Sequence, residues 1–250
     1  MSCSYYLPFT PRFQKGGRND GVIVNKKSVK GLRMEIGVAV SQDGAHWSRV
    51  EGPNPFCSIL EPGKPGDFDG QSVGWPCVIE VESEYRMYYH SYNALARKYC
   101  VGLAVARDGL MNWKKRGVVF QGGNSPNDFD ARGASRRHVV KLESGGYKMW
   151  YEAISDKEVH SIGCASSPDG YQWTKLSATP IFEANSAVAG AWDAGGVGSP
   201  HVIWLEDTRT WRMYYTGFNI DGDMLYKSSI GVAESLDEEG LQFRRIDVIL

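Results

Sequence analysis

Four stretches of the chain repeat one pattern, in which a short apolar strand is followed by a turn and an aromatic residue. They are GVAVSQDGAHW from Gly37, GLAVARDGLMNW from Gly102, GCASSPDGYQW from Gly163 and GVAESLDEEGLQF from Gly231. Three copies contain an Asp-Gly pair, which predicts a hairpin turn because glycine accepts a positive φ. A repeat of this length indicates that each copy belongs to one supersecondary unit, and that stacked units make the fold.

Two further sets of segments interleave with the first. RMYYH, KMWYE and RMYYT place methionine at 87, 149 and 213, and FDGQSVGWPCVI, FDARGASRRHVV and WDAGGVGSPHVI place aspartate at 69, 130 and 193. One unit therefore contains an aromatic-Asp entry, an inner strand, a Met-Tyr-Tyr type strand, a Gly-x-Ala type strand, a turn and a fourth strand. Four antiparallel strands per unit without helical periodicity predict an all-β chain folded as a β-propeller.

The spacing of these segments predicts a single propeller domain over residues 1–250. We expect a partial first blade at 1–50 and repeating units at about 51–115, 116–178 and 179–250. Ser4-Tyr5-Tyr6 is interpreted as the remnant of a Met-Tyr-Tyr strand, and the polar segment from Tyr6 to Gly37 as a surface loop. Three full units and a partial one form either a closed four-bladed ring or part of a five-bladed ring. The second is favoured, because propellers normally pair their strand edges.

Composition narrows the possible partners and compartment. The 28 basic and 29 acidic side chains are intermixed and sum to a net charge of −1, so we expect no nucleic acid and no anionic membrane surface as partner. No segment is long enough to span a membrane, and the N-terminus lacks the pattern of a secretory signal. The five cysteines form no CxxC pair, which indicates reduced thiols and an intracellular protein. The oligomeric state is left open.

The repeated segments resemble the five-bladed β-propeller glycoside hydrolases of the arabinanase, levansucrase and invertase type, families 43 and 32 among them. The resemblance covers nearly the whole chain and rests on four features. These are the aromatic-Asp entry, the proline of the inner strand (Trp75-Pro76, Ser199-Pro200), the Met-Tyr-Tyr strand, and the strand pair joined by the Asp-Gly turn. It implies a carbohydrate ligand in a central cavity, where one Asp acts as base or nucleophile, another Asp tunes pKa values and a Glu acts as the acid.

The chain departs from that family at one set of equivalent positions. Two of the family's acids commonly lie directly before the proline of an inner strand or at the matching position, where this chain has Trp75, Arg136 and Ser199. None of the three is a carboxylate. This departure favours a propeller that binds a glycan or a protein over one that hydrolyses a glycosidic bond.

Four carboxylates are the candidate catalytic residues. Asp69, Asp130 and Asp193 recur in every full copy, which favours a structural role in which each accepts backbone N–H groups at a strand entry. They are also the best candidate bases, since blade entries face the cavity. Glu152 is the only acid that directly follows a Met-Tyr-Tyr type strand, and apolar surroundings there would raise its pKa and suit it to act as the general acid. The alternative is a solvated glutamate at a strand end.

Residues that differ between the copies are the candidate ligand contacts. Alternate residues of a strand share a face, so Trp75 pairs with Cys77, Arg136 with His138, and Ser199 with His201. The predicted substrate-binding residues are Trp75, His90, Arg132, Arg136, His138, Ser199 and His201. The arginines indicate an anionic or polyhydroxyl ligand, or else pairing with Asp128, Asp130 and Glu143. Trp75 either stacks on a sugar ring or is a core residue.

The same alternation places Cys77, His138 and His201 at equivalent positions of three blades. A ring of thiol and imidazole groups can hold zinc, but buried cysteine and histidine are common in protein cores, so no metal and no cofactor are expected. His46 and His160 are given no role.

Three functions follow from the sequence. The first is a glycosidase-like hydrolase with Glu152 as acid and one of the three aspartates as base. The second is a binding propeller without catalysis. A glycosyl transferase or phosphorylase, with the arginines as a phosphate site, ranks third.

Overall fold

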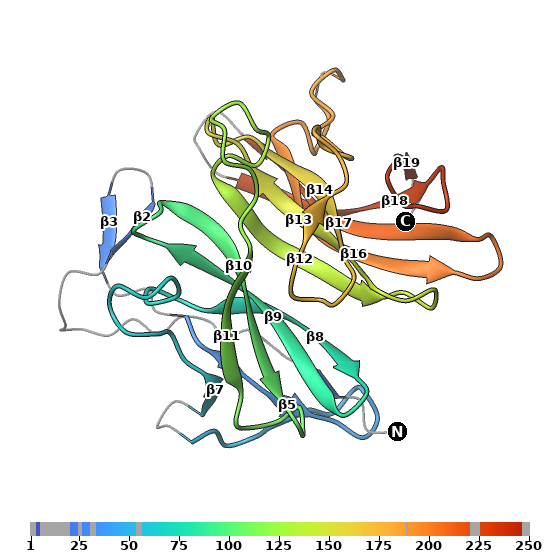
Figure 1. Ribbon diagram of the computed structural model, residues 1–250. Helices are drawn as coiled ribbons and strands as arrows, with labels where there is room; N and C mark the ends of the chain where they lie inside the picture. Colours follow the sequence, from blue (N-terminus) through green and yellow to red (C-terminus); the bar gives the residue numbers. More distant parts are fainter. Residues whose placement is uncertain are drawn as a thin grey trace. The chain divides into compact units, whose positions relative to one another are not determined.

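A computed structural model describes residues 34–53, 57–188, 190–220 and 226–246, together with strand backbone at 4–5, 21–24 and 27–30. The described residues contain only strands, turns and irregular segments, and the strands pair antiparallel (Figure 1). The all-β fold class is therefore confirmed. In the part of the chain that is described, no helix is long and apolar enough to cross a membrane.

The chain divides into two compact units, residues 1–118 and 119–250. The predicted boundary between two repeating units, at about residue 115, lies close to this division. The described strands do not include a closed propeller, so the single propeller domain and its number of blades stay predictions.

The first unit contains one full set of four strands, called here the first blade, and several shorter strands. The first blade consists of β8 (Gly74–Val81), β9 (Glu84–Asn93), β10 (Lys98–Ala106) and β11 (Lys114–Phe120). The shorter strands are β1 (Ser4–Tyr5), β2 (Gly21–Val24), β3 (Lys27–Lys30), β4 (Ile36–Gly37), β5 (Ala39–Val40), β6 (Ser48–Arg49) and β7 (Ser58–Leu60).

The N-terminal strand pairs as the sequence predicted. Strand β1 lies antiparallel to β5, with Tyr5 opposite Ala39, and β5 continues to β6. This is the order of the last three strands of a blade; Tyr6 itself lies outside the described residues. The expected surface loop from Tyr6 to Gly37 is wrong in part, since β2 and β3 form a hairpin within it and β4 pairs with β7.

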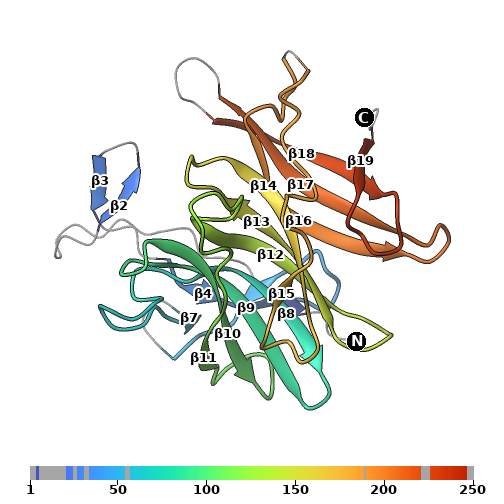
Figure 2. The same cartoon turned by 45° about the horizontal axis from the view of Figure 1, so that its top comes forward.

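The second unit contains two sets of four strands, each connected in chain order (Figure 2). The second blade consists of β12 (Gly133–Lys141), β13 (Tyr147–Ile154), β14 (His160–Ser167) and β15 (Thr174–Lys175). The third blade consists of β16 (Gly196–Leu205), β17 (Thr210–Ile220), β18 (Tyr226–Ser235) and β19 (Phe243–Ile246).

Each full blade places a glycine of its third strand directly opposite a tyrosine of its second strand. The pairs are Tyr89 and Gly102, Tyr151 and Gly163, and Tyr215 and Gly231. A Cβ atom on any of these glycines would lie 2.4–2.5 Å from the ring of its tyrosine. The repeated Gly-x-Ala and Met-Tyr-Tyr segments are thus two halves of one packing contact, because the ring lies where a larger residue would place its side chain.

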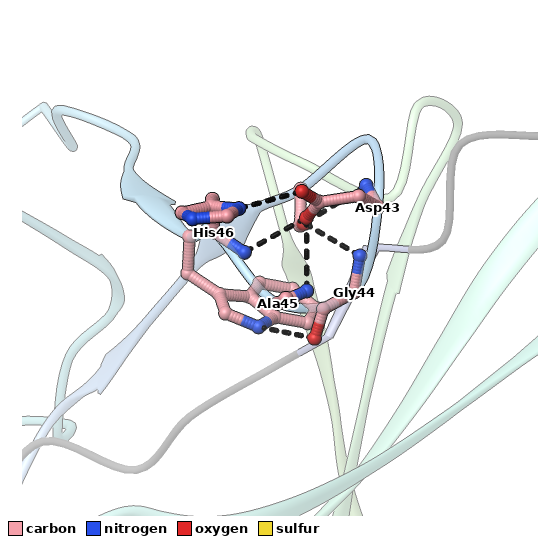
Figure 3. Close-up of polar contacts among 6 residues, drawn as sticks. Asp43, Gly44, Ala45 and His46 are labelled. Carbon is pink, nitrogen blue, oxygen red and sulfur yellow. Dashed lines mark hydrogen bonds and ion pairs between the residues drawn. The ribbon is translucent and has the colours of Figure 1, made fainter.

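The Asp-Gly turns form as predicted. At the first of them the Asp43 carboxylate accepts the N–H groups of Ala45 and His46 at 2.9 and 2.8 Å and contacts the His46 ring at 2.6 Å (Figure 3). The His46 and Ala45 hydrogen bonds hold the pKa of Asp43 well below its usual range. Gly44 has a φ of 75°, the left-handed conformation for which glycine was expected.

We predict that Gly163→Ala destabilises the protein much more than Gly74→Ala. The new methyl group at 163 meets the Tyr151 ring at 2.5 Å, whereas one at Gly74 meets only the Met34 side chain at 3.6 Å. Overpacking of this kind costs about 1–3 kcal/mol. Denaturant unfolding of both variants checks this, and equal midpoints would contradict the packing described here.

Candidate functional site

The three repeated aspartates are each held by the tyrosine of their own blade. The hydroxyl groups of Tyr89, Tyr151 and Tyr215 donate to Asp69, Asp130 and Asp193 at 2.9, 2.9 and 3.0 Å. Burial and the adjacent carboxylate raise the pKa of each tyrosine, so each hydroxyl keeps its proton and remains a donor. The aromatic-Asp entry is thereby attached to the second strand of its blade.

A cation from the fourth strand completes each contact. Lys115, Lys175 and Arg245 approach Asp69, Asp130 and Asp193 at 2.7, 2.9 and 2.8 Å. The aspartates are at most 2% exposed. The expectation that backbone N–H groups hold these carboxylates is wrong, because the hydrogen-bond partners of their carboxylates are side chains. We call each Tyr–Asp–cation set a blade link. The catalytic role of these aspartates stays a prediction.

Glu152 lies at the end of β13 and is the centre of a polar cluster in the second unit. Its Oε2 accepts hydrogen bonds from the Ser199 N–H at 3.0 Å and from Arg136 Nη1 at 3.3 Å, and its Oε1 contacts His160 Nδ1 at 2.8 Å. Arg136 Nη1 also donates to Ser199 Oγ at 3.2 Å. We call Arg136, Glu152, His160 and Ser199 the polar cluster.

The structure corrects the expected protonation state of Glu152. Burial alone raises its pKa, but the His160 hydrogen bond, the charge of Arg136 and the Ser199 N–H outweigh burial, so the pKa lies below its ordinary value. The predicted increase of its pKa is wrong, and so is the alternative of a solvated strand end, since Glu152 is 2% exposed. An ionised glutamate does not suit the predicted role of general acid.

The inner strands bulge where the family resemblance expects acids. The pairing register shifts by one residue between Gly74 and Cys77, between Ala134 and Arg137, and between Gly198 and His201. Trp75 and Ser199 have φ values of 44° and 50°, which is unusual for residues other than glycine. Bulges re-aim side chains and are frequent beside functional sites. The bulge of the third blade directs the Ser199 N–H towards Glu152.

The predicted arginines find acidic partners other than those expected. Arg132 Nη1 lies 3.3 Å from Glu158, an exposed ion pair, and Arg136 contacts Glu152. The expected pairing of Arg132 and Arg136 with Asp128, Asp130 and Glu143 is therefore wrong, because their acidic partners are Glu158 and Glu152.

His138 and His201 lie together, with ring centroids 4.1 Å apart. Nδ1 of His138 accepts the N–H of Val202 at 3.2 Å, so its proton lies on Nε2 and that nitrogen has no lone pair for a metal ion. Burial, then the charges of His201 and Arg137, lower the pKa of His138 to about 3, and burial lowers that of His201. Among the described residues no three His, Cys, Asp or Glu side chains form a metal-binding group.

In the first unit the predicted contact residues form an aromatic cluster. Trp75 meets His90 edge-on at 5.1 Å between centroids, and His90 stacks on Tyr99 at 5.5 Å. His90 is buried, while Trp75 is half-buried. Cys77, the third member of the predicted metal ring, lies on β8 of the same unit, is half-buried and is not part of a disulfide.

The sequence missed His160. It begins β14 and lies opposite Ile154, so it is placed on Glu152 only by the pairing register of β13 and β14. Alignment of the third strands puts His160 at the position of Tyr99 and Ser228, where all three copies differ. That difference is the signal that would have singled it out.

We predict that Glu152→Gln lowers stability mainly above pH 5. Because the folded pKa of Glu152 is below its unfolded value, its charged interactions stabilise the protein fully above about pH 5 and are lost as the pH falls through the folded pKa. Unfolding free energies of wild type and variant should therefore differ most at pH 7, and the difference should shrink as the pH falls through the folded pKa of Glu152. A difference that grows on acidification would show the opposite shift.

No family model matches the sequence. Two Mycobacterium tuberculosis proteins, the uncharacterized proteins Rv1502 and MT1551, are each 30% identical over 188 residues, which are 73% of this chain and 56% of the relative. The chain thus spans about half the length of the curated relatives it matches.

Solved structures show the same fold. A glycosyl hydrolase from Bacteroides ovatus is 18% identical with a TM-score of 0.64, covering 88% of this chain and 63% of its own. Fructan 1-exohydrolase IIa from Cichorium intybus is 17% identical with a TM-score of 0.54, and the match covers 74% of this chain and 33% of the exohydrolase. A third structure comes from work on the GH130 family of mannoside phosphorylases, which contains glycoside hydrolases. It is 19% identical to this chain with a TM-score of 0.65, and the match covers 88% of this chain and 63% of the other. The resemblance is confirmed at the level of fold: the chain has the fold of the β-propeller glycoside hydrolases.

Proposed function

We propose that this protein binds an oligo- or polysaccharide through the polar cluster of the second unit. The fold it shares with glycoside hydrolases supports a carbohydrate ligand. The cluster supports the position of the site, because it combines three partly exposed donor side chains with one buried ionised acceptor. Arg136 is 34% and His160 28% exposed, and Ser199 is half-buried.

The chemistry of the cluster suits sugar hydroxyl groups. A sugar hydroxyl group both donates and accepts, so it can accept from the Arg136 guanidinium while donating to the Ser199 hydroxyl, and the buried Glu152 carboxylate holds Arg136 and Ser199 in place. Hydrogen bonds that involve an ionised partner are roughly twice as strong as neutral ones. The contacts within the cluster hold these groups in place before the ligand arrives, which reduces the entropy lost on binding.

One observation favours binding over hydrolysis: every predicted acid is in contact with a cationic group. Glycoside hydrolysis requires one protonated and one ionised carboxyl group. Glu152 has a lowered pKa beside Arg136, and each of the three aspartates contacts a lysine or arginine.

A hydrolase remains the second candidate, with Glu152 in a different role from the one the sequence suggested. An ionised, well-ordered carboxylate suits the base or nucleophile of the reaction, and the acid would then come from another residue. A phosphorylase is disfavoured by the same geometry, because a phosphate at Arg136 would lie beside the Glu152 carboxylate and be repelled.

We predict that Glu152→Gln weakens glycan binding by about 10- to 100-fold, the effect of losing a hydrogen bond to a charged group. A glycan array finds the ligand, and calorimetry compares wild type, Glu152→Gln and the control Glu238→Gln. Glu238 is 63% exposed in a surface ion pair with Arg209, so this control should bind like wild type.

A panel of nitrophenyl glycosides decides between the two candidates. Binding without turnover supports the proposal. Turnover by wild type that is lost in Glu152→Gln would establish the hydrolase instead, and the absence of any bound glycan would overturn the carbohydrate ligand.

A further inference from the structure

Three successive side chains on one face of β13 contact the third blade. Side chains alternate along a strand, so Lys148, Trp150 and Glu152 share a face, and each is at most 4% exposed. Glu152 accepts the N–H of Ser199 from the bulge of the third blade. Trp150 belongs to the same hydrophobic cluster as Met213 of that blade. The face that carries the centre of the polar cluster is therefore also a packing surface between two blades.

The turn between β18 and β19 receives the other two contacts (Figure 1, red). Trp150 Nε1 donates to the carbonyl oxygen of Gly240 at 2.9 Å, and this bond is buried. Lys148 Nζ donates to the carbonyl oxygen of Glu239 at 2.6 Å and lies 3.2 Å from its carboxylate. We call these contacts of Lys148 and Trp150 with the turn the latch. It joins the second blade to the third at two successive carbonyl groups.

Gly240 lets the turn approach β13 this closely. A Cβ atom on Gly240 would lie 2.9 Å from Trp150 Cζ2 and 2.9 Å from Trp211 Cδ1. The centroids of the two indole rings are 4.9 Å apart. The φ of Gly240 is 63°, a conformation that other residues rarely adopt. Both the space and the backbone conformation at the latch therefore require glycine.

Two of the Asp-Gly turns are closed by a tryptophan of their own instead. Trp47 and Trp173 each donate their Nε1–H to the carbonyl oxygen of the glycine in the turn that precedes them, at 3.0 and 3.1 Å. The third blade has Phe243 at this position, and phenylalanine has no N–H group. The carbonyl group that a turn's own tryptophan holds elsewhere is thus held here by Trp150 of the neighbouring blade.

The second blade differs from the other two at the matching positions. Trp150 replaces the tyrosine that the first and third blades have at Tyr88 and Tyr214. The position of Lys148 is an arginine in those blades, and each arginine pairs with a glutamate of its own blade. The differences on β13 therefore complement those in the turn of the third blade. Such a match indicates a specific contact between these two blades.

We propose that Lys148 and Trp150 are positioning residues of the polar cluster, because the latch holds the third blade where its Ser199 N–H meets Glu152. This inference rests on the proposed function in that it takes the polar cluster as the binding site. Glu152 follows Trp150 by two residues on the same face, so the latch and the Ser199 contact are two attachments of one strand to one blade. A group held in place before binding loses less entropy when the ligand arrives.

The protonation of Glu152 reports directly on this positioning. The Ser199 N–H is one of the groups that hold the pKa of Glu152 below its ordinary value. When the latch is weakened, this donor moves away and the pKa of Glu152 rises, because the charged carboxylate loses a hydrogen bond. A latch that only stabilises the fold would leave the pKa of the folded protein unchanged.

NMR titration of the Glu152 carboxyl carbon tests the proposal without any ligand. The signal is followed in protein that contains isotopically labelled glutamate, and it is identified by its absence in Glu152→Gln. Trp150→Phe removes the indole N–H and keeps an aromatic ring. Lys148→Met removes the other donor and answers the question if the first variant does not fold. Trp173→Phe is the matched control, because it removes the same kind of hydrogen bond within the second blade.

We expect the pKa of Glu152 to rise in Trp150→Phe and in Lys148→Met and to keep its wild-type value in Trp173→Phe. An unchanged pKa in the latch variants would show that the latch only stabilises the fold, and would overturn the proposal. An equal rise in the control would overturn it as well. These results are independent of the glycan: the absence of a bound glycan overturns the proposed function and leaves the positioning of Glu152 intact.

Discussion

The blade link is the interaction on which the rest of the described structure depends. A carboxylate with no exposed surface is tolerated only when it is paired and hydrogen-bonded. In each full blade a tyrosine hydroxyl from the second strand and a cation from the fourth strand satisfy the aspartate that enters the first. One buried charge thus connects three parts of a blade that are far apart in sequence, and the glycine of the remaining strand makes room for the tyrosine ring.

This link separates structural residues from those available for function. Positions that recur in every blade are occupied by the link and its packing, so they have little freedom to vary. The ends of the second strands differ, with His90, Glu152 and Thr216 at equivalent places, and so do the bulged positions of the inner strands. In the second unit two of these varying positions meet, since the bulge at Ser199 donates its N–H to Glu152.

Much of the fold could be predicted from the sequence because it repeats locally. The Asp-Gly turns, the four strands of a blade and the N-terminal strand at Tyr5 all depend on short-range patterns that appear more than once. The partners of the aspartates could not be predicted in this way. Lys175 lies 45 residues after Asp130 and Arg245 lies 52 after Asp193, so their contacts follow only from the packed blade.

The sequence predicts which residues form the candidate site better than it predicts their protonation states. Arg136, Glu152 and Ser199 were singled out as positions that vary between copies, and they do meet. The pKa of Glu152 was predicted in the wrong direction, because its value depends on His160, a residue that enters only through the register of two strands. The sequence left open whether that carboxylate is buried or solvated; it is buried, and burial with three donors stabilises the charged form.

In the account proposed above, the repeated aspartates hold each blade together while the varying residues contact the ligand. The substitution Asp130→Asn separates these two roles, since it keeps the shape of the side chain and removes the charge beside Lys175. We predict that the unfolding free energy falls by about 1.5–3 kcal/mol while the folded variant binds its glycan with unchanged affinity. Unchanged stability together with lost binding or lost activity would contradict the account and return Asp130 to a direct role in the site.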